Sequence, residues 1–311
     1  MGVLVSVIRQ GYPPKSRFSV GDIPDLSGKV MIVTGGSVGI GRETVKALLH
    51  HNAKVYIAAR NEEASRKTIE ELKNETDKEA VFLKLDLGDF QSIKAAVTEF
   101  QSKESKLDVL FNNAGVMAPP VDLVTAQGYD LQFGTNTLGH FYFTTLLLPQ
   151  LFAGAKSSPD NKARVINTAS AGAELASGID FDTIKDGPKR KKKGTHRLYL
   201  QSKLGNVVFS NELARRYGDK GIVSVALNPG NIESNLQRHL GYWDGLLVKS
   251  ILWPLQYGAL TQLYAGTTPE GAELNGKYLI PWARIGNNLA TATPKLGEEL
   301  WNFMEEQIKD V

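Results

Sequence analysis

Residues 34–41 read Thr34-Gly35-Gly36-Ser37-Val38-Gly39-Ile40-Gly41, between the apolar run Val30–Val33 and an amphipathic stretch that starts at Glu43. A strand that turns through glycines into a helix can cradle a phosphate group. The glycines permit the tight turn, and the helix N-terminus presents unpaired N–H groups with partial positive charge. The spacing T-G-x-x-x-G-x-G differs from the dinucleotide fingerprint G-x-G-x-x-G. The motif alone therefore fits either a flexible turn or a nucleotide site.

The composition limits the classes of function. The chain has 311 residues, of which 42% are hydrophobic and 22% are charged, as is typical of a globular protein with a sizeable core. Its net charge of +3 is too small to indicate a nucleic-acid partner, and we expect none. There is no cysteine, and the five histidines form no metal-binding pattern, so we expect neither a disulfide nor a metal site.

The N-terminal region, residues 1–27, is predicted to be an irregular leader because three prolines oppose regular structure: Pro13, Pro14 and Pro24. Its first residues fit the loose pattern for N-myristoylation at Gly2, which is often matched by chance. The apolar stretch is too short for a signal peptide, and nothing reaches the roughly 18 apolar residues of a membrane span. We expect a cytoplasmic protein and leave peripheral membrane contact open.

From residue 28 onward, short β-branched runs alternate with helical patterns, and no composition break divides the chain. This alternation predicts right-handed crossovers and a parallel sheet. We predict one α/β domain, 28–311, with a Rossmann-type doubly wound parallel sheet and helices on both faces. The predicted strands are Lys29–Val33, Lys54–Ala58, Ala80–Lys84, Leu107–Phe111, Arg164–Asn167, Val223–Ala226 and Lys277–Ile280. The predicted helices are Gly41–His50, Glu62–Asn74, Phe90–Ser102, Gly128–Phe152 and Leu198–Tyr217.

The end of the second predicted strand indicates which cofactor is bound. Arg60 follows Gly41 by about 20 residues, where the adenosine ribose lies in such sheets. A guanidinium there suits a 2′-phosphate, so we predict NADP(H) over NAD(H). A solvated loop arginine is the alternative interpretation. Glu62 and Glu63 are the other candidate ribose ligands, but they fit better in the first turn of a helix capped by Asn61.

Further signatures follow in order along the chain: Asp86-Leu87, Asn112-Asn113-Ala114-Gly115, Ser170, Tyr199-Leu200-Gln201-Ser202-Lys203 and Pro229-Gly230. With the glycine motif in front of them, residues 28–282 resemble the short-chain dehydrogenase/reductase (SDR) family, and in particular its branch of retinol dehydrogenases and fungal reductases. The resemblance implies an NAD(P)-dependent enzyme acting on CH–OH donors. Such an enzyme interconverts a carbonyl and an alcohol by hydride transfer.

Tyr199 and Lys203 are four residues apart and share one helix face. A free tyrosine has a pKa of about 10, and a nearby ammonium stabilises the phenolate and lowers that pKa toward neutrality. We therefore expect Tyr199 to be the acid/base. Y-x-x-x-K by itself also fits the surface of an amphipathic helix, but its place after the fifth predicted strand favours catalysis.

Two more residues complete the predicted catalytic set. Ser170 follows the fifth strand, where ligands of open α/β sheets bind, and the resemblance implies that it holds the substrate oxygen. The family usually has Ser-Ser where this chain has Ala169-Ser170, and Thr168 is the alternative hydroxyl. Asn136 lies within a predicted helix, which asparagine does not favour. The resemblance implies that it binds a water linking Lys203 to solvent, and a capped kink or a surface asparagine is the alternative.

The remaining cofactor contacts follow from the resemblance. Asp86 would face the adenine amino group with Leu87 beside the ring, and Asn113 and Gly115 would lie near the riboses. Ile232 and Ser234 would meet the carboxamide, where the family often has threonine in place of Ser234. The predicted cofactor set is completed by Gly35, Ser37, Val38, Gly39, Ile40, Gly41, Arg60, Ala114, Tyr199, Lys203, Pro229 and Gly230.

Two segments bear on partners. An apolar region at about 235–265 matches the family's substrate lid and favours a hydrophobic small-molecule substrate such as a long-chain aldehyde, ketone, retinoid or steroid. An interfacial membrane helix is the alternative. The basic run Lys189–Lys193 is interpreted as a solvated loop. A nuclear signal, an anionic-membrane contact and steering of acidic substrates are the alternatives.

Two other functions stay open at this point. One is a catalytically silent NADP(H)-binding sensor or scaffold, which would not need Ser170, Tyr199 and Lys203 together. The other is an epimerase or dehydratase with the same tyrosine–lysine pair, which the glycine spacing disfavours. A homodimer through the helices after the fourth and fifth strands is an alternative to a core role for Phe141, Phe143, Leu146, Leu147, Val207, Val208 and Leu213.

Overall fold

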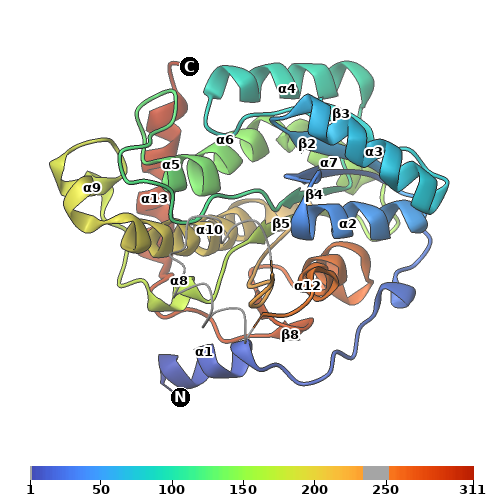
Figure 1. The fold of residues 1–311 in the computed structure, drawn as a ribbon. Coiled ribbons are helices and arrows are strands. Elements are labelled where there is room, and N and C mark those ends of the chain that lie inside the picture. The colour runs from blue at the N-terminus through green and yellow to red at the C-terminus, as the bar shows by residue number, and fades with distance from the viewer. Residues whose placement is uncertain (1, 234–251) are drawn as a thin grey trace.

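One sheet organises the computed structural model, which describes residues 2–233 and 252–311 (Figure 1). Within these residues the strand order is β3-β2-β1-β4-β5-β6-β7-β8, and all neighbours are parallel except β7 and β8. The order reverses between β1 and β4, which opens a crevice at the carboxyl ends of these strands. The strands are β1 Val30–Thr34, β2 Lys54–Ala59, β3 Val81–Lys84, β4 Val109–Asn112, β5 Ala163–Thr168, β6 Ile222–Leu227, β7 Tyr278–Ile280 and β8 Arg284–Ile285.

Helices cover both faces of the sheet (Figure 1). One face carries α2 Gly39–His50, α3 Glu62–Thr76 and α12 Leu255–Thr267. The other carries α4 Phe90–Lys103, α6 Gly139–Leu146, α7 Leu148–Ser157 and α10 Thr195–Tyr217, with α13 Pro294–Ile308 packed on α10. The predicted α/β doubly wound fold is therefore confirmed.

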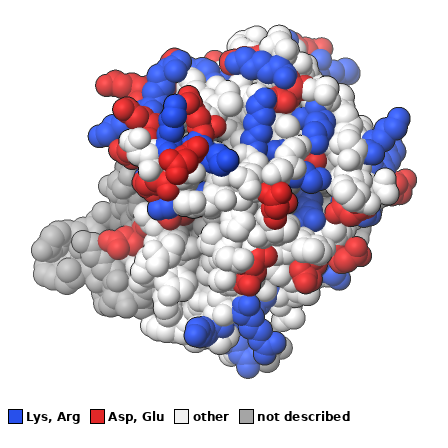
Figure 2. Space-filling view, turned by 90° about the vertical axis from the view of Figure 1, so that its right-hand side faces the viewer, with Lys and Arg blue, Asp and Glu red and all other residues white. Residues whose placement is uncertain are grey.

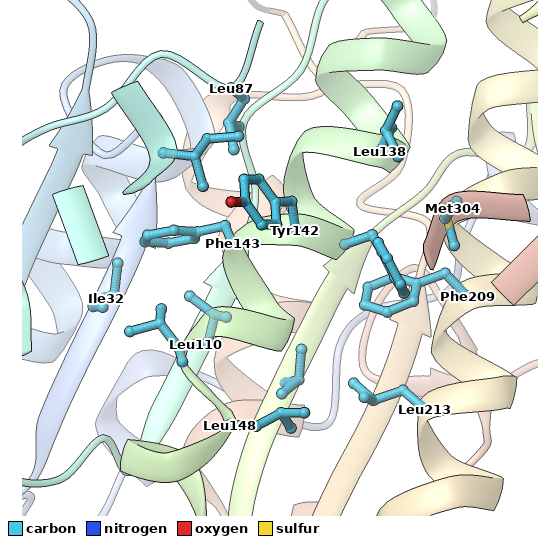
Figure 3. Close-up of a cluster of buried hydrophobic side chains, with 14 of the residues drawn as sticks. Ile32, Leu87, Leu110, Leu138, Tyr142, Phe143, Leu148, Phe209, Leu213 and Met304 are labelled. Carbon is cyan, nitrogen blue, oxygen red and sulfur yellow. The ribbon is translucent and has the colours of Figure 1, made fainter. Parts of the chain in front are cut away.

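Alternate strand residues enter two hydrophobic clusters, one on each face of the sheet. In β1, for example, Ile32 joins the cluster beneath α4, α6 and α10, whereas Met31 and Val33 join the one beneath α2 and α12. Because both faces are buried, the strands read as continuous apolar runs. Figure 3 shows the first cluster, in which Phe209 lies beside Met304. The ring of Phe209 also packs against Phe141, with 5.7 Å between ring centroids.

The predicted strands all occur, with each end within two residues of its predicted position. The sequence analysis missed β8 and α13. The apolar residues Leu300, Trp301 and Met304 of α13 are buried against the core. Their helical spacing was a usable signal, and the segment packs on α10 as a structural helix.

The prediction of an irregular leader is wrong for its first part. Val3–Gly11 form helix α1, and a 3₁₀ turn follows at Val20–Asp22. Pro13 and Pro14 come after the helix, so they end it and do not prevent it. Helix α1 lies beside β8, where the Arg284 guanidinium donates to the backbone carbonyl of Arg9 at 3.3 Å (Figure 1).

The predicted helix Gly128–Phe152 is wrong in its continuity. The Asp130 carboxylate accepts from two backbone N–H groups and starts α5, Leu131–Phe133, later than predicted. A π-helical turn, Gly134–Leu138, precedes α6, and Pro149 lies in the first turn of α7. The apolar residues that the sequence analysis weighed for a dimer interface are buried in the core of the single chain or packed against it. The core role therefore explains them.

Two further predictions need correction. The predicted lid range extends too far, because its last residues lie in α12, where Ala259 and Leu263 are buried against the sheet. The rest of the lid falls mostly outside the described residues. The basic run is solvated in part, since Lys189, Lys191 and Lys192 are exposed, but it forms helix α9, Pro188–Lys193, and not a loop. Its Arg190 is 0% exposed and pairs with Asp130 at 3.2 Å.

Figure 2 shows one face of the molecule, on which basic and acidic side chains are interspersed. Ion pairs between α2 and α3, such as Lys46–Glu75, have both members at least partly exposed. Exposed pairs of this kind contribute little to stability. The two hydrophobic clusters therefore dominate the energetics of the fold.

We expect Phe209→Ala to lower the free energy of unfolding by about 3–5 kcal/mol, because it opens a cavity between Phe141 and Trp301. Urea denaturation followed by tryptophan fluorescence and circular dichroism measures this loss. The matched control is Leu123→Ala, which truncates a side chain that is 48% exposed and should change stability by no more than about 0.5 kcal/mol. Equal losses in the two variants would contradict the assigned core.

Candidate active site

A cavity of about 700 Å³ lies at the carboxyl ends of the central strands. It brings together residues that the sequence analysis assigned to the cofactor from six separate segments. Ser170 lines the same cavity. Ser234 lies outside the described residues. The predicted cofactor residues that line the cavity are Gly35, Ser37, Val38, Gly39, Ile40, Gly41, Arg60, Asp86, Leu87, Asn113, Ala114, Gly115, Tyr199, Lys203, Pro229, Gly230 and Ile232.

The glycine turn folds back tightly on itself before α2 begins at Gly39. A Cβ atom on Gly41 would lie 2.3 Å from the carbonyl oxygen of Gly35, so only glycine fits there. The backbone carbonyl of Ser37 accepts a hydrogen bond from Thr68 at 3.0 Å, which fixes the turn to α3. The N-terminus of α2, with its unpaired N–H groups, faces this cavity. These features fit a pyrophosphate group.

A second set of contacts joins the turn to the segment after β4. The Thr34 hydroxyl oxygen accepts from the backbone N–H groups of Asn113 and Ala114, both at 2.9 Å. The Asn113 side chain returns a bond to the Thr34 carbonyl at 2.9 Å. The two loops at the reversal of strand order are thus held as one unit.

The end of β2 has the predicted arrangement. Arg60 is exposed and lines the cavity. Asn61 caps α3 by accepting from the N–H of Ala64, and Glu62 and Glu63 lie in the first turn, as expected. Glu62 pairs with Arg66 at 2.7 Å. Neither glutamate lines the cavity, which leaves Arg60 as the charged group on this part of its wall.

Tyr199, Lys203 and Ser170 all line this cavity. The Ser170 side chain lies close enough to Tyr199 for its hydroxyl to lower the pKa of that phenol. The Lys203 ammonium donates to the backbone carbonyl of Thr168 at 3.0 Å, and its Nζ lies 5.8 Å from the centre of the Tyr199 ring. The Thr168 hydroxyl donates to Gln262 at 3.1 Å, so Ser170 supplies the hydroxyl beside Tyr199.

The electrostatics of this pair differ from the prediction. Burial raises the pKa of Tyr199 to about 12, although the Ser170 hydroxyl lowers it. Burial also lowers the pKa of Lys203 to about 8. The expectation that the ammonium brings the tyrosine pKa toward neutrality is therefore wrong for this structure, because desolvation of the phenolate is the larger effect. The site favours a protonated phenol.

Asn136 is 0% exposed, which excludes a surface position. Its side-chain oxygen accepts from the N–H of Val116 at 2.8 Å, and its amide nitrogen donates to the Val116 carbonyl and to the Ser202 hydroxyl, both at 3.0 Å. A Cβ atom on Gly115 would lie 3.1 Å from the Asn136 side-chain oxygen and 3.5 Å from Lys203 Nζ. Asn136 therefore ties the segment after β4 to the helix that carries Tyr199 and Lys203.

Comparison with known proteins supports the assignment. A family model for short-chain dehydrogenases matches residues 29–179. A short-chain dehydrogenase/reductase of Armillaria gallica is 55% identical over 311 residues, and the match covers 100% of both chains. The chain belongs to the short-chain dehydrogenase/reductase family. Another SDR protein, from Phomopsis amygdali, is 40% identical and covers 96% of this chain and 95% of its own.

Solved structures agree with this family. A Pseudomonas aeruginosa RhlG/NADP complex is 26% identical, with a TM-score of 0.66 and coverage of 83% of this chain and 95% of that one. A 3-ketoacyl-(acyl-carrier-protein) reductase from Brucella melitensis, complexed with NADH, shares the fold at 23% identity, a TM-score of 0.64 and coverage of 82% and 96%. The protein is thus an NAD(P)-dependent oxidoreductase of the SDR family.

The SDR sequence pattern did not point to the contribution of α1. Gln10 is 1% exposed and accepts a hydrogen bond from Asn228 at 2.8 Å, while its own amide donates to Glu174. Asn228 lines the cavity and its side-chain oxygen accepts from the N–H of Gly230 at 3.1 Å. The N-terminal helix of this SDR protein therefore supports the loop after β6. In the sequence, only Asn228, directly before Pro229-Gly230, could have indicated a polar contact at this loop.

Two properties of the described residues complete the account of this SDR protein. In 2–233 and 252–311, no group of three or more His, Asp or Glu side chains could hold a metal ion. No helix in the same ranges is long and apolar enough to cross a membrane.

Proposed function

We propose that this SDR protein is an NADP(H)-dependent carbonyl reductase that acts on a hydrophobic small molecule, with Tyr199 as the acid. The observation that supports this most directly is the meeting of Ser170, Tyr199 and Lys203 in the cavity that holds the glycine turn. When bound, NADPH would supply the hydride and leave as NADP⁺.

In this proposal each side chain has one task. Ser170 donates a hydrogen bond to the substrate carbonyl oxygen and orients it. Tyr199 gives that oxygen its proton, and the raised pKa keeps the phenol protonated at neutral pH. The Lys203 ammonium lies over the Tyr199 ring and stabilises the phenolate that remains after the transfer.

The preference for NADP(H) rests on Arg60. It is the charged residue at the end of β2 that lines the cavity, and its guanidinium can pair with a 2′-phosphate. The Pseudomonas aeruginosa relative is an NADP complex, whereas the Brucella melitensis protein is complexed with NADH.

The apolar lining of the cavity supports the substrate class. Val116, Met117, Ile232 and Leu252 all line it. Pockets with a largely apolar wall and a few convergent polar groups suit small hydrophobic ligands. A long-chain or ring-containing aldehyde or ketone fits this description.

The first experiment follows NADPH oxidation over a panel of apolar aldehydes, ketones and quinones. We expect Tyr199→Phe to lower kcat by about 10²–10⁴-fold, because it removes the proton donor. The affinity for NADPH, measured by fluorescence titration, should stay within about twofold. Tyr278→Phe is the matched control, since that buried phenol donates to the Ser170 carbonyl at 3.2 Å and does not line the cavity. It should retain activity within about tenfold.

Turnover that survives Tyr199→Phe would contradict the proposed acid. Tight NADPH binding without turnover by the wild type on any carbonyl compound would favour a nucleotide sensor over an enzyme.

The cofactor preference is tested by Arg60→Ala. We expect NADPH affinity to fall by roughly tenfold to a hundredfold, because a charge-assisted contact to the 2′-phosphate is lost. NADH affinity should change by less than about twofold. Arg66→Ala is the matched control, because it removes the same charge from a position that pairs with Glu62 outside the cavity. Equal affinity for both cofactors, unchanged by Arg60→Ala, would contradict the preference.

The lowered pKa of Lys203 predicts the pH dependence of the reduction. As the pH rises through about 8, Lys203 loses its charge, and kcat/KM for the carbonyl substrate should fall. The measurement is kcat/KM from pH 6 to pH 10 at saturating NADPH, with circular dichroism as the control for folding. In Lys203→Arg the side chain stays charged over this range, so the fall in its residual activity should move to higher pH. An identical decline in both proteins would show that another group titrates.

A further inference from the structure

His140 lies one helical turn after Asn136, in α6, and is 1% exposed. Both of its ring nitrogens have partners. Nδ1 is 2.9 Å from the backbone carbonyl oxygen of Asn136, and Nε2 is 2.9 Å from the hydroxyl oxygen of Thr34. The imidazole therefore connects the π-helical turn that contains Asn136 with the end of β1.

The partners fix the tautomer of the ring. A carbonyl oxygen only accepts, so Nδ1 carries the hydrogen and donates it to Asn136. Burial, aided by the nearby charge of Lys203, lowers the pKa of His140 to about 4, although the bond to Asn136 raises it. The ring is neutral, Nε2 carries no hydrogen, and it accepts from the Thr34 hydroxyl.

The hydrogen bonds around this ring run in one direction. The N–H groups of Asn113 and Ala114 donate to Thr34, Thr34 donates to His140, and His140 donates to the Asn136 carbonyl. The Thr34 hydroxyl also has the Phe111 carbonyl at 3.2 Å, which is a longer contact than the one to His140. Polarised chains of this kind strengthen each member in a low-dielectric interior.

The end of this chain is connected to helix α10, which carries the acid/base pair. The Asn136 side chain holds the backbone of Val116 and the hydroxyl of Ser202, the residue directly before Lys203. A π-helical turn inside an α-helix often marks a functional site. Here the Asn136 carbonyl within that turn receives the imidazole N–H.

We propose that His140 is a positioning residue that holds the π-helical turn, and through Asn136 the Lys203 segment, in register with the cofactor turn. His140 does not line the cavity that we assign to cofactor and substrate. The expected effect of His140 on the reaction rate rests on the proposed reductase function. The tautomer of the ring and its two hydrogen bonds do not depend on that function.

The first arm of the test is spectroscopic and needs no turnover. With ¹⁵N-labelled histidine, long-range ¹H–¹⁵N correlation spectra distinguish protonated from unprotonated ring nitrogens, and His140→Asn identifies the His140 signal among the five histidines. We expect a neutral ring protonated at Nδ1, with an Nε2 shift that changes in Thr34→Val. A ring protonated at Nε2, or an Nε2 shift unaffected by Thr34→Val, would overturn the proposed chain.

The second arm compares three substitutions. Asparagine places an amide nitrogen near the position of Nδ1, glutamine places one near Nε2, and phenylalanine keeps the ring shape without either bond. We expect kcat to fall by about 10–100-fold in His140→Phe and His140→Gln and by no more than about threefold in His140→Asn. NADPH affinity should stay within about threefold in all of them.

Thr144→Val is the matched control for loss of a buried hydrogen bond in the same helix. The Thr144 hydroxyl is 0% exposed and accepts a hydrogen bond from the Asn112 side chain at 3.0 Å. It takes no part in the hydrogen bonds that join Thr34, His140 and Asn136. It should leave kcat within about threefold. If Thr144→Val lowers kcat as much as His140→Phe, or if His140→Asn fails to rescue kcat, the positioning role is wrong. A wild type without turnover would defeat the proposed reductase function, and the spectroscopic arm would still decide the hydrogen-bond chain.

Discussion

The contact between Thr34 and the segment after β4 is the constraint on which the active-site edge depends. The strand order reverses between β1 and β4, so no crossover helix covers the gap above their ends. Thr34 connects the two strand ends. Its hydroxyl oxygen accepts hydrogen bonds from two backbone N–H groups, and its carbonyl oxygen accepts one from the Asn113 side chain. Thr34 is 0% exposed, and without its hydroxyl the two partly buried N–H groups would lose their acceptor. The glycine turn and the segment after β4 therefore keep one relative position.

The electrostatics of the acid/base pair follow from what Lys203 is bonded to. Lys203 is 5% exposed, and the acceptor of its ammonium is the Thr168 carbonyl, not a carboxylate. A carboxylate would neutralise the ammonium and raise its pKa. A carbonyl satisfies one N–H bond and leaves the positive charge uncompensated, which is why burial lowers the pKa. The same burial raises the pKa of Tyr199, so each of the two charges is unfavourable when it forms alone.

Much of this architecture follows from local sequence. The strands could be predicted because residues such as Val30–Val33 are buried on both faces of the sheet and form unbroken apolar runs. Asn61 marked the start of α3 because its side chain caps the helix through a contact within one turn. The glycine turn could also be predicted. A side chain at position 41 would collide with the backbone of Gly35, which belongs to the same motif. In each case the partner that determines the conformation lies nearby in the chain.

The parts that could not be predicted have distant partners. Helix α1 is short, and isolated helices of its length are marginal in water. Its buried anchor, Gln10, bonds to Asn228 and Glu174, which no local pattern around Gln10 could indicate. The π-helical turn is similar, because the bond from His140 to the Asn136 carbonyl is fixed by Thr34, at the far end of another strand. Arg190, in a run of basic residues, is buried because Asp130 lies opposite it. In all three places a polar side chain is buried against polar groups from another segment, and such groups specify a position only after the sheet has brought those segments together.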